Sequence, residues 1–170
     1  MIVASSQLMD PVEIRRRYGM TLTGLMHEHG IAPDPFLEHV HDIDLAAVAA
    51  TPALAAAIGR LPGRKIVYTN GSRAHARKVT AALGLSGAFD ALYGVEDAGY
   101  RAKPHADAFA AVFGAAGLAT RRAAMFEDDP RNLAVPHELG MRTVLVGPGE
   151  MAAHVEHQTD DLTDFLARVV

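Results

Sequence analysis

The feature that most constrains the fold is a repeated alternation of short apolar segments with helical ones. Apolar segments typical of buried strands lie at 65–69, 90–95, 122–126 and 141–146, and a segment with helical character follows each of them. Repeated strand-then-helix units form parallel sheets, because the helix returns the chain across the sheet by a right-handed crossover. The sequence therefore predicts an α/β fold with a parallel sheet flanked by helices.

The segment that precedes the first strand is predicted to be helical. A capping aspartate followed by proline, Asp10-Pro11, begins a helix that ends at Gly30, and a second short helix follows it. We therefore divide the chain into a small helical segment, residues 1–50, and an α/β core, residues 51–170.

Each of two polar clusters in the helical segment can be interpreted either as a functional site or as part of the solvated surface. Arg15, Arg16 and Arg17 can clamp a substrate, but consecutive charges more often form a solvated helix face. Several histidines and aspartates invite a metal site, although helical residues two apart point to different sides, so we favour a solvated surface here too. These are His27, His29, His39, His41, Asp42 and Asp44.

Composition excludes several classes of function. The 170 residues are 49% hydrophobic and 21% charged, which is typical of one globular domain that buries a real core. A net charge of −4 does not suggest binding to nucleic acid, whose phosphates require a positively charged surface. With no cysteine there is no disulfide, thiolate metal site or cysteine nucleophile, which fits a cytoplasmic protein. We find no membrane-spanning run and no signal peptide.

The most informative local stretch is Ala123–Asn132, an apolar run that stops at the three acids Glu127, Asp128 and Asp129. Carboxylates at the C-terminal end of a strand, just before a helix begins at Pro130, lie where open α/β sheets bind ligands. Adjacent carboxylates repel one another unless a cation lies among them, and hard oxygen ligands of this kind suit Mg²⁺. A solvated acidic loop is the alternative.

Two further strand ends carry polar groups that suit a phosphate. Thr69 ends the first strand, and Asn70-Gly71-Ser72 turns the chain into a helix whose N-terminal N–H groups can bind an anion, although ordinary helix caps look the same. Lys103 precedes the next helix, where a cation can hold a phosphate, although a lone lysine is more often a surface residue. We predict that Thr69, Lys103 and Asp128 share one rim.

Three of these segments together resemble motifs two, three and four of the haloacid dehalogenase-like hydrolases. They are Ile-Val-Tyr-Thr-Asn-Gly (66–71), Lys-Pro (103–104) and Met-Phe-Glu-Asp-Asp-Pro-Arg-Asn-Leu (125–133). Flanking segments such as Val-Glu-Asp-Ala-Gly-Tyr (95–100) and Val-His-Asp-Ile-Asp (40–44) resemble the pyrimidine 5′-nucleotidase branch. The resemblance implies a Rossmann-like core with a small helical cap formed by the N-terminal segment.

The resemblance also implies which residues bind the phosphoryl group of a substrate. Thr69 and Lys103 would be the catalytic residues: Thr69 would hydrogen-bond the phosphoryl oxygens, and Lys103 would neutralise charge on the phosphoryl group and the nucleophile. Asn70 and Gly71 would offer backbone donors to the same oxygens.

The acidic stretch is the metal side of the site implied by the resemblance. Asp128 would bind Mg²⁺, and Glu127 would either bind the ion as well or support the ligands that do. Asn132 would orient the acidic loop, whereas Asp129 matches no fixed role in the family.

One part of the family pattern is not found in this sequence. These enzymes attack phosphorus with the first aspartate of an Asp-x-Asp motif that ends a central strand, and the second aspartate acts as general acid and base. The one Asp-x-Asp here, Asp42-Ile43-Asp44, follows a polar segment that is not a buried strand, so we reject it as the nucleophile. We expect strands 65–69 and 122–126 to face a gap, filled by Met1–Ser5, by a neighbouring copy or by residues outside this sequence.

Three functions fit these observations. The first is a Mg²⁺-dependent phosphomonoester hydrolase for a small phosphorylated substrate such as a nucleoside monophosphate, whose catalysis requires the missing aspartate. The second is a non-catalytic relative that binds a phosphate ligand or a protein partner, and the third is a scaffold without a ligand. Polar groups of three kinds on one rim favour the first two. An open sheet edge can also pair with a second copy, so we expect a homodimer as one assembly.

Overall fold

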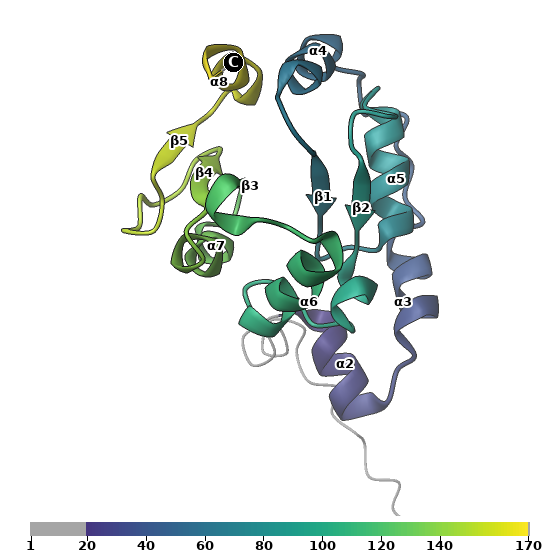
Figure 1. The fold of residues 1–170 in the computed structure, drawn as a ribbon. Coiled ribbons are helices and arrows are strands. Elements are labelled where there is room, and N and C mark those ends of the chain that lie inside the picture. Colours follow the sequence, from purple (N-terminus) through teal and green to yellow (C-terminus); the bar gives the residue numbers. More distant parts are fainter. Residues whose placement is uncertain (1–19, 170) are drawn as a thin grey trace, which may run out of the picture. The chain divides into compact units, whose positions relative to one another are not determined.

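The computed structural model describes residues 20–169 of the chain (Figure 1). Its contacts divide the chain into two compact units, Met1–His41 and Asp42–Val170. The division falls earlier than residue 50, where we place the end of the helical segment from the sequence. The cluster Arg15–Arg17 and the segment Met1–Ser5 lie outside the described residues.

The first unit contains two short helices, as its sequence predicts. Helix α2 (Thr21–His29) ends at Gly30, whose positive φ of 60° turns the chain so that the Ile31 N–H reaches back to the Leu25 carbonyl at 3.4 Å. Helix α3 (Pro33–Val40) begins with proline, which is favoured there because the first N–H of a helix has no partner inside the helix. Among the described residues, no three histidines, cysteines or carboxylates are grouped as possible ligands of one metal ion.

The second unit alternates strands and helices along the chain. Its elements are α4 (Pro52–Arg60), β1 (Ile66–Tyr68), α5 (Arg73–Ala82), β2 (Ala91–Tyr93), η1 (Val95–Ala98), α6 (Ala106–Ala116), η2 (Thr120–Arg122), β3 (Ala124–Glu127), η3 (Pro130–Leu133), α7 (Ala134–Glu138), β4 (Arg142–Val146), β5 (His157–Thr159) and α8 (Leu162–Arg168). The four predicted strands are all present, each within a few residues of its predicted bounds.

The strands form two separate parallel sheets rather than one. Strands β1 and β2 pair in the first, and β3, β4 and β5 follow one another in the second. Strand β5 was not predicted from the sequence, because His-Gln-Thr is a short, polar and largely exposed segment without an apolar pattern. It is an edge strand, and its pairing with β4 stabilises it in place of burial.

The outer edge of β1 faces away from β2 without a strand partner among the described residues. The N–H of Thr69 donates to the Tyr93 carbonyl at 3.0 Å, so this residue faces β2. Backbone groups of successive strand residues alternate between the two edges, so those of Ile66 and Tyr68 face the other way.

Strand β3 has an equivalent open edge within residues 20–169. The Ala123 carbonyl accepts the Arg142 N–H at 3.0 Å and therefore faces β4, so the backbone groups of Ala124 and Phe126 face away from it. Ala124 is exposed and Phe126 only half-buried, although each lies on a strand of the core. The two open edges belong to the strands that we expect to face a gap.

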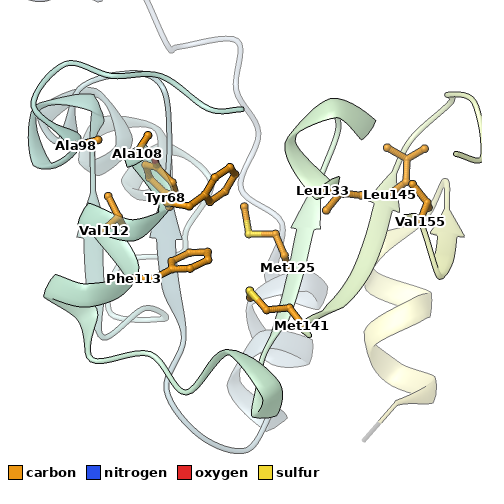
Figure 2. Close-up of a cluster of buried hydrophobic side chains, with 11 residues drawn as sticks. Tyr68, Ala98, Ala108, Val112, Phe113, Met125, Leu133, Met141, Leu145 and Val155 are labelled. Atoms are coloured by element: carbon orange, nitrogen blue, oxygen red, sulfur yellow. The ribbon is translucent and has the colours of Figure 1, made fainter. Parts of the chain in front are cut away.

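Helix α6 supplies four of the eleven residues of the larger buried apolar cluster, more than any other element (Figure 2). The ring of Tyr68 packs edge-on against Phe109, with 5.8 Å between ring centres, and Phe113 and Met125 belong to the same cluster. Full burial of a side chain such as Phe109 stabilises the fold by roughly 1.5–3 kcal/mol. The cluster joins α6 to residues of both sheets.

A second apolar cluster lies between α4 and α8. Ile58 and Leu166 are buried in it, and Phe126 of β3 packs edge-on against Phe165 with 6.1 Å between ring centres. None of the helices among residues 20–169 combines the length and the apolar character that crossing a bilayer requires.

Candidate active site

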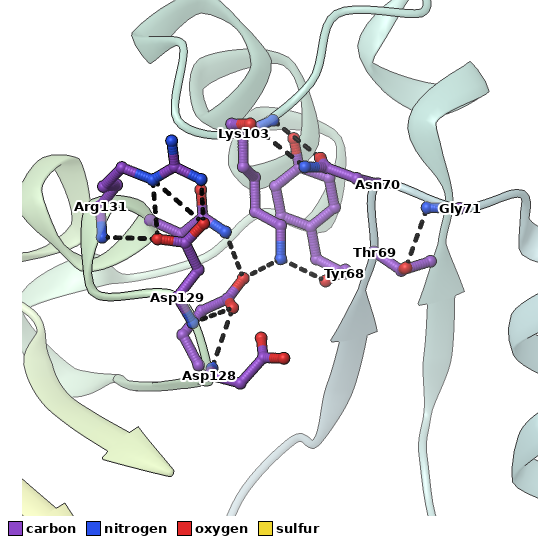
Figure 3. Close-up of polar contacts among 10 residues, drawn as sticks. Tyr68, Thr69, Asn70, Gly71, Lys103, Asp128, Asp129 and Arg131 are labelled. Atoms are coloured by element: carbon purple, nitrogen blue, oxygen red, sulfur yellow. Dashed lines mark hydrogen bonds and ion pairs between the residues drawn. The ribbon is translucent and has the colours of Figure 1, made fainter. Parts of the chain in front are cut away.

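The centre of the polar rim is a buried ion pair between Lys103 and Glu127 (Figure 3). Each of the two side chains is only 7% exposed. The Lys103 ammonium donates to Glu127 Oε1 and, at 3.0 Å, to the Tyr68 carbonyl, whose backbone faces the open edge of β1. Lys103 therefore connects the C-terminal end of β1 to that of β3.

Both oxygens of Glu127 are occupied by protein donors. Oε1 also accepts the side-chain amide of Asn132 at 3.2 Å, and Oε2 accepts the backbone N–H of Asp128 at 3.1 Å and that of Asp129 at 3.5 Å. A buried carboxylate is tolerated only when a cation and hydrogen bonds replace its water. These contacts explain why Glu127 and Asn132 are buried while the next two acids are not.

Asp128 differs from Glu127 in having an exposed side chain. No contact of its carboxylate with another described residue is found, and in Figure 3 no dashed line reaches the carboxylate of Asp128. An exposed carboxylate of this kind is the hard oxygen ligand that Mg²⁺ prefers, with water supplying other ligands. The described residues contain no group of three possible ligands, so protein groups there would provide only part of a coordination sphere.

Asp129 is committed to Arg131. Its Oδ1 accepts the Arg131 N–H at 3.0 Å, which caps η3, and its carboxylate also binds the Arg131 guanidinium, with Nη2 to Oδ2 at 2.6 Å. The hydrogen bond and then the negative charge of Asp129 raise the pKa of Arg131. Asp129 therefore stabilises the turn that begins η3, a role that the sequence alone did not indicate.

The turn after β1 uses most of its own donors. The Gly71 N–H donates to Thr69 Oγ at 3.0 Å, and Ser72 Oγ accepts the His75 N–H at 3.1 Å as the cap of α5. Gly71 was expected to offer its N–H to a phosphate, but in this structure that donor is bound to Thr69. A phosphate would have to compete for it.

The N-terminus of α5 is already occupied by a carboxylate, which the sequence did not predict. Glu96 Oε1 accepts the Arg73 N–H at 2.8 Å, and Asp97 binds both the Arg73 guanidinium and the Gly94 N–H. A Cβ at Gly94 would overlap Glu96 and the Arg73 backbone, so only glycine fits. The turn after β2 is thus tied to the turn after β1.

Asn70 and Tyr68 also contact Lys103 in ways that the sequence did not indicate. The Asn70 side chain pairs with the backbone of Lys103 through two hydrogen bonds of 2.8 and 3.1 Å. The Lys103 ammonium lies 5.0 Å from the centre of the Tyr68 ring. Burial, and then the charge of Glu127, raise the pKa of Tyr68 to about 12. Local sequence carries no signal for contacts between residues so far apart in the chain.

Hydrogen bonds and backbone connections therefore link most of the predicted site residues into one chain of contacts, from Thr69 and Asn70 through Lys103 to Glu127 and Asp128. Asp42 and Asp44 do not lie on a strand: they occupy a loop after α3, where Asp44 accepts the Ala46 N–H at 2.8 Å.

Comparison with protein families gives one match, over residues 9–140, to the family described as haloacid dehalogenase-like hydrolase. No curated protein matches the chain significantly. Similar folds occur among solved structures at low sequence identity. The L-2-haloacid dehalogenase of Xanthobacter autotrophicus, with chloropropionic acid covalently bound, is 17% identical over 89% of this chain and 75% of that one, with a TM-score of 0.62.

Two further structures are similar over nearly the whole chain. A haloacid dehalogenase-like protein of Agrobacterium tumefaciens is 20% identical over 96% of this chain and 84% of that one, with a TM-score of 0.60. A hydrolase of the same family from Deinococcus radiodurans, with bound phosphate and sodium, is 21% identical over 98% of this chain and 76% of that one, with a TM-score of 0.58.

Proposed function

The chain belongs to the haloacid dehalogenase-like hydrolases, and from that premise we propose that it is a Mg²⁺-dependent phosphomonoester hydrolase. The observation that carries the proposal is the contrast between Glu127, buried against the Lys103 ammonium, and Asp128, whose carboxylate is exposed beside that pair. A lysine and an exposed carboxylate close to each other suit a phosphate and a divalent cation.

Asp128 is the residue that would hold Mg²⁺, and Glu127 would support the loop that carries it. Bound there, the ion would neutralise phosphate charge and orient the phosphoryl group. Lys103 would donate to a phosphoryl oxygen, and the Thr69 hydroxyl, which accepts the Gly71 N–H, has its own proton available for another oxygen. Glu127 holds Lys103 in place for this contact.

Hydrolysis through a covalent intermediate needs an attacking carboxylate, and we propose that it enters between the open edges of β1 and β3. Its oxygen would bond to phosphorus as the bond to the ester oxygen breaks, and the alcohol would leave with a proton from a second acid. Water would then cleave the acyl phosphate, which releases phosphate and restores the carboxylate. A strand inserted there would also pair the edge groups of Ile66, Tyr68, Ala124 and Phe126.

We propose a nucleoside monophosphate as the substrate, a homodimer as one assembly and the cytoplasm as the location. The nucleotide rests on the resemblance of segments 40–44 and 95–100 to pyrimidine 5′-nucleotidases. The dimer rests on the open strand edges, which can pair with another copy. The location rests on the lack of cysteine.

A non-catalytic relative that binds phosphate is the second candidate. It is favoured by one observation: among residues 20–169, no strand with a carboxylate at its end lies between β1 and β3. Such a protein would retain Mg²⁺-dependent phosphate binding through Asp128 and Lys103 but would not turn over.

The test is release of phosphate by the whole 170-residue chain from an aryl phosphate and a panel of nucleoside monophosphates, with Mg²⁺ and then with chelator. Chloride release from 2-chloropropionate is measured beside it, because a similar structure carries that group. Mg²⁺-dependent turnover that Lys103→Ala abolishes and Lys78→Ala retains would support the hydrolase. Phosphate binding without turnover would support the second candidate, and chloride release without phosphate release would reject both.

A further inference from the structure

We infer that Asn70 is a positioning residue, whose side-chain amide fixes the place of the Lys103 ammonium between the ends of β1 and β3. The inference deepens the proposed function, since it concerns the lysine that would meet the phosphoryl group. It goes beyond the role expected for Asn70, which was only to offer its backbone N–H to a phosphate.

The geometry at Asn70 is that of a paired amide. Its Nδ2 donates to the Lys103 carbonyl at 3.1 Å, and its Oδ1 accepts the Lys103 N–H at 2.8 Å. The two bonds fix the orientation of the amide, because the backbone N–H must meet the oxygen and the carbonyl must meet the nitrogen. A neutral amide at this distance is required, since aspartate has no donor for the carbonyl and alanine has neither group.

The other end of Lys103 is held by the same strand end. Its ammonium donates to the Tyr68 carbonyl at 3.0 Å, two residues before Asn70. Lysine has a long flexible stem, and fixing its backbone restricts where the ammonium can lie. Because both ends of Lys103 are tied to residues 68–70, the ammonium is directed at Glu127 across the open edge of β1.

A second tie between the same two turns provides a matched control. Arg73 binds Glu96 through its backbone N–H and Asp97 through its guanidinium, and neither contact involves Lys103. Arg73→Ala removes the contact with Asp97 and keeps the backbone contact with Glu96. If Asn70 served only to hold the turns together, weakening this second tie would also disturb Lys103. If Asn70 positions the lysine directly, the two variants would differ.

The experiment follows hydrogen exchange of the lysine ammonium groups by NMR in the ¹⁵N-labelled full chain. The chain has only the lysines Lys65, Lys78 and Lys103, and Lys103→Arg identifies the third signal. We expect slow exchange at Lys103 in the unaltered chain and in Arg73→Ala. Asn70→Ala is expected to speed it about tenfold, which corresponds to about 1.4 kcal/mol, while the signals of Lys65 and Lys78 stay unchanged.

Asn70→Asp keeps the size of the side chain and tests the donor alone, and it also serves if Asn70→Ala does not fold. Faster exchange at Lys103 in either Asn70 variant, but not in Arg73→Ala, supports the inference. Exchange within twofold of the unaltered chain in both Asn70 variants, or an equal increase in Arg73→Ala, overturns it. The measurement needs neither substrate nor Mg²⁺, so its outcome is independent of whether the chain hydrolyses phosphate esters.

Discussion

Adjacent acids lie at the ends of two strands of the core, the pair Glu96-Asp97 after β2 and the pair Glu127-Asp128 at the end of β3. The structure uses these two pairs differently. After β2, Glu96 binds the N-terminus of α5, and Asp97 binds both Arg73 and the Gly94 N–H. At the end of β3, Glu127 likewise binds protein donors, on Lys103 and Asn132, but the side chain of Asp128 contacts no other described side chain.

This difference distinguishes carboxylates that stabilise the fold from carboxylates that are available to bind a ligand. A carboxylate bound to protein donors stabilises the turn around it, and removing it leaves buried groups without partners. An exposed carboxylate without such donors gives the fold little stability. By this criterion Glu96, Asp97 and Glu127 stabilise the fold, and Asp128 is the acid that we propose as the ligand-binding one.

The largest effect is expected from breaking the buried pair. Lys103→Met leaves the Glu127 carboxylate buried without a cation, which is expected to lower the free energy of unfolding by about 3–5 kcal/mol. Urea denaturation measures it, with Lys78→Met on the exposed face of α5 as the control. A loss below about 1 kcal/mol would mean that the pair is hydrated and behaves as a surface salt bridge.

A methyl group added beside the acids after β2 should give the next largest loss of stability. A Cβ at Gly94 would overlap Glu96 and the Arg73 backbone, so Gly94→Ala is expected to destabilise the fold by about 1–3 kcal/mol. Gly59 lies in α4 with open space around it, and Gly59→Ala should stabilise the fold by about 0.5–1 kcal/mol. Thermal unfolding of both variants compares them directly, and equal shifts would show that the turn relaxes around the methyl group.

Tyr68 gives a pH-dependent test of the environment around Glu127. Its pKa is raised from 10 to about 12, by burial and then by the charge of Glu127. The folded state therefore keeps a proton that the unfolded state loses, so this contribution to stability is complete below pH 10 and is lost as the pH rises through about 12. Tyr68→Phe lacks this contribution.

The measurement compares the free energy of unfolding of the unaltered chain and Tyr68→Phe below pH 10 and near pH 12. We expect the stability of the unaltered chain to fall relative to the variant over this range. A second titration, of tyrosine absorbance in Glu127→Gln, should show Tyr68 ionising at lower pH. A difference between the two chains that does not change with pH would contradict the assignment.

Much of the fold was predictable because the signals that specify it are local. Pro52 begins α4 as its position in the sequence predicts, and all four apolar segments form parallel strands. Strand β5 was missed because its residues are polar, and its pairing with β4 depends on a segment outside its own sequence. Alternation of apolar residues identifies buried strands, not edge strands held by backbone pairing.

The candidate site was predictable in its residue types but not in its contacts. The strand ends identified Thr69, Lys103 and Asp128, because parallel strands bring their C-terminal ends to one edge. Glu127 is buried because it binds Lys103 and Asn132, whereas Asp128 has no such partners and is exposed. Only folding brings Lys103 to Glu127, so the local sequence could not predict this difference. At Gly94, by contrast, the residue type itself is explained by a contact, since only glycine allows Glu96 and the Arg73 backbone to approach so closely.

The smallest effect on stability, and the most informative one, is expected at Asp128. Because its carboxylate is exposed and contacts no other described side chain, Asp128→Asn should change the free energy of unfolding by less than about 0.5 kcal/mol. A ligand that binds only the folded state raises its stability, so Mg²⁺ with phosphate should raise the melting temperature of the unaltered chain but not that of Asp128→Asn. Asp129→Asn, which loses the negative charge that pairs with Arg131, should keep the response to Mg²⁺ while losing some stability. If Asp128→Asn were instead the less stable variant and still responded to Mg²⁺, Asp128 would be committed to the fold like Glu96, and the two acid pairs would no longer differ.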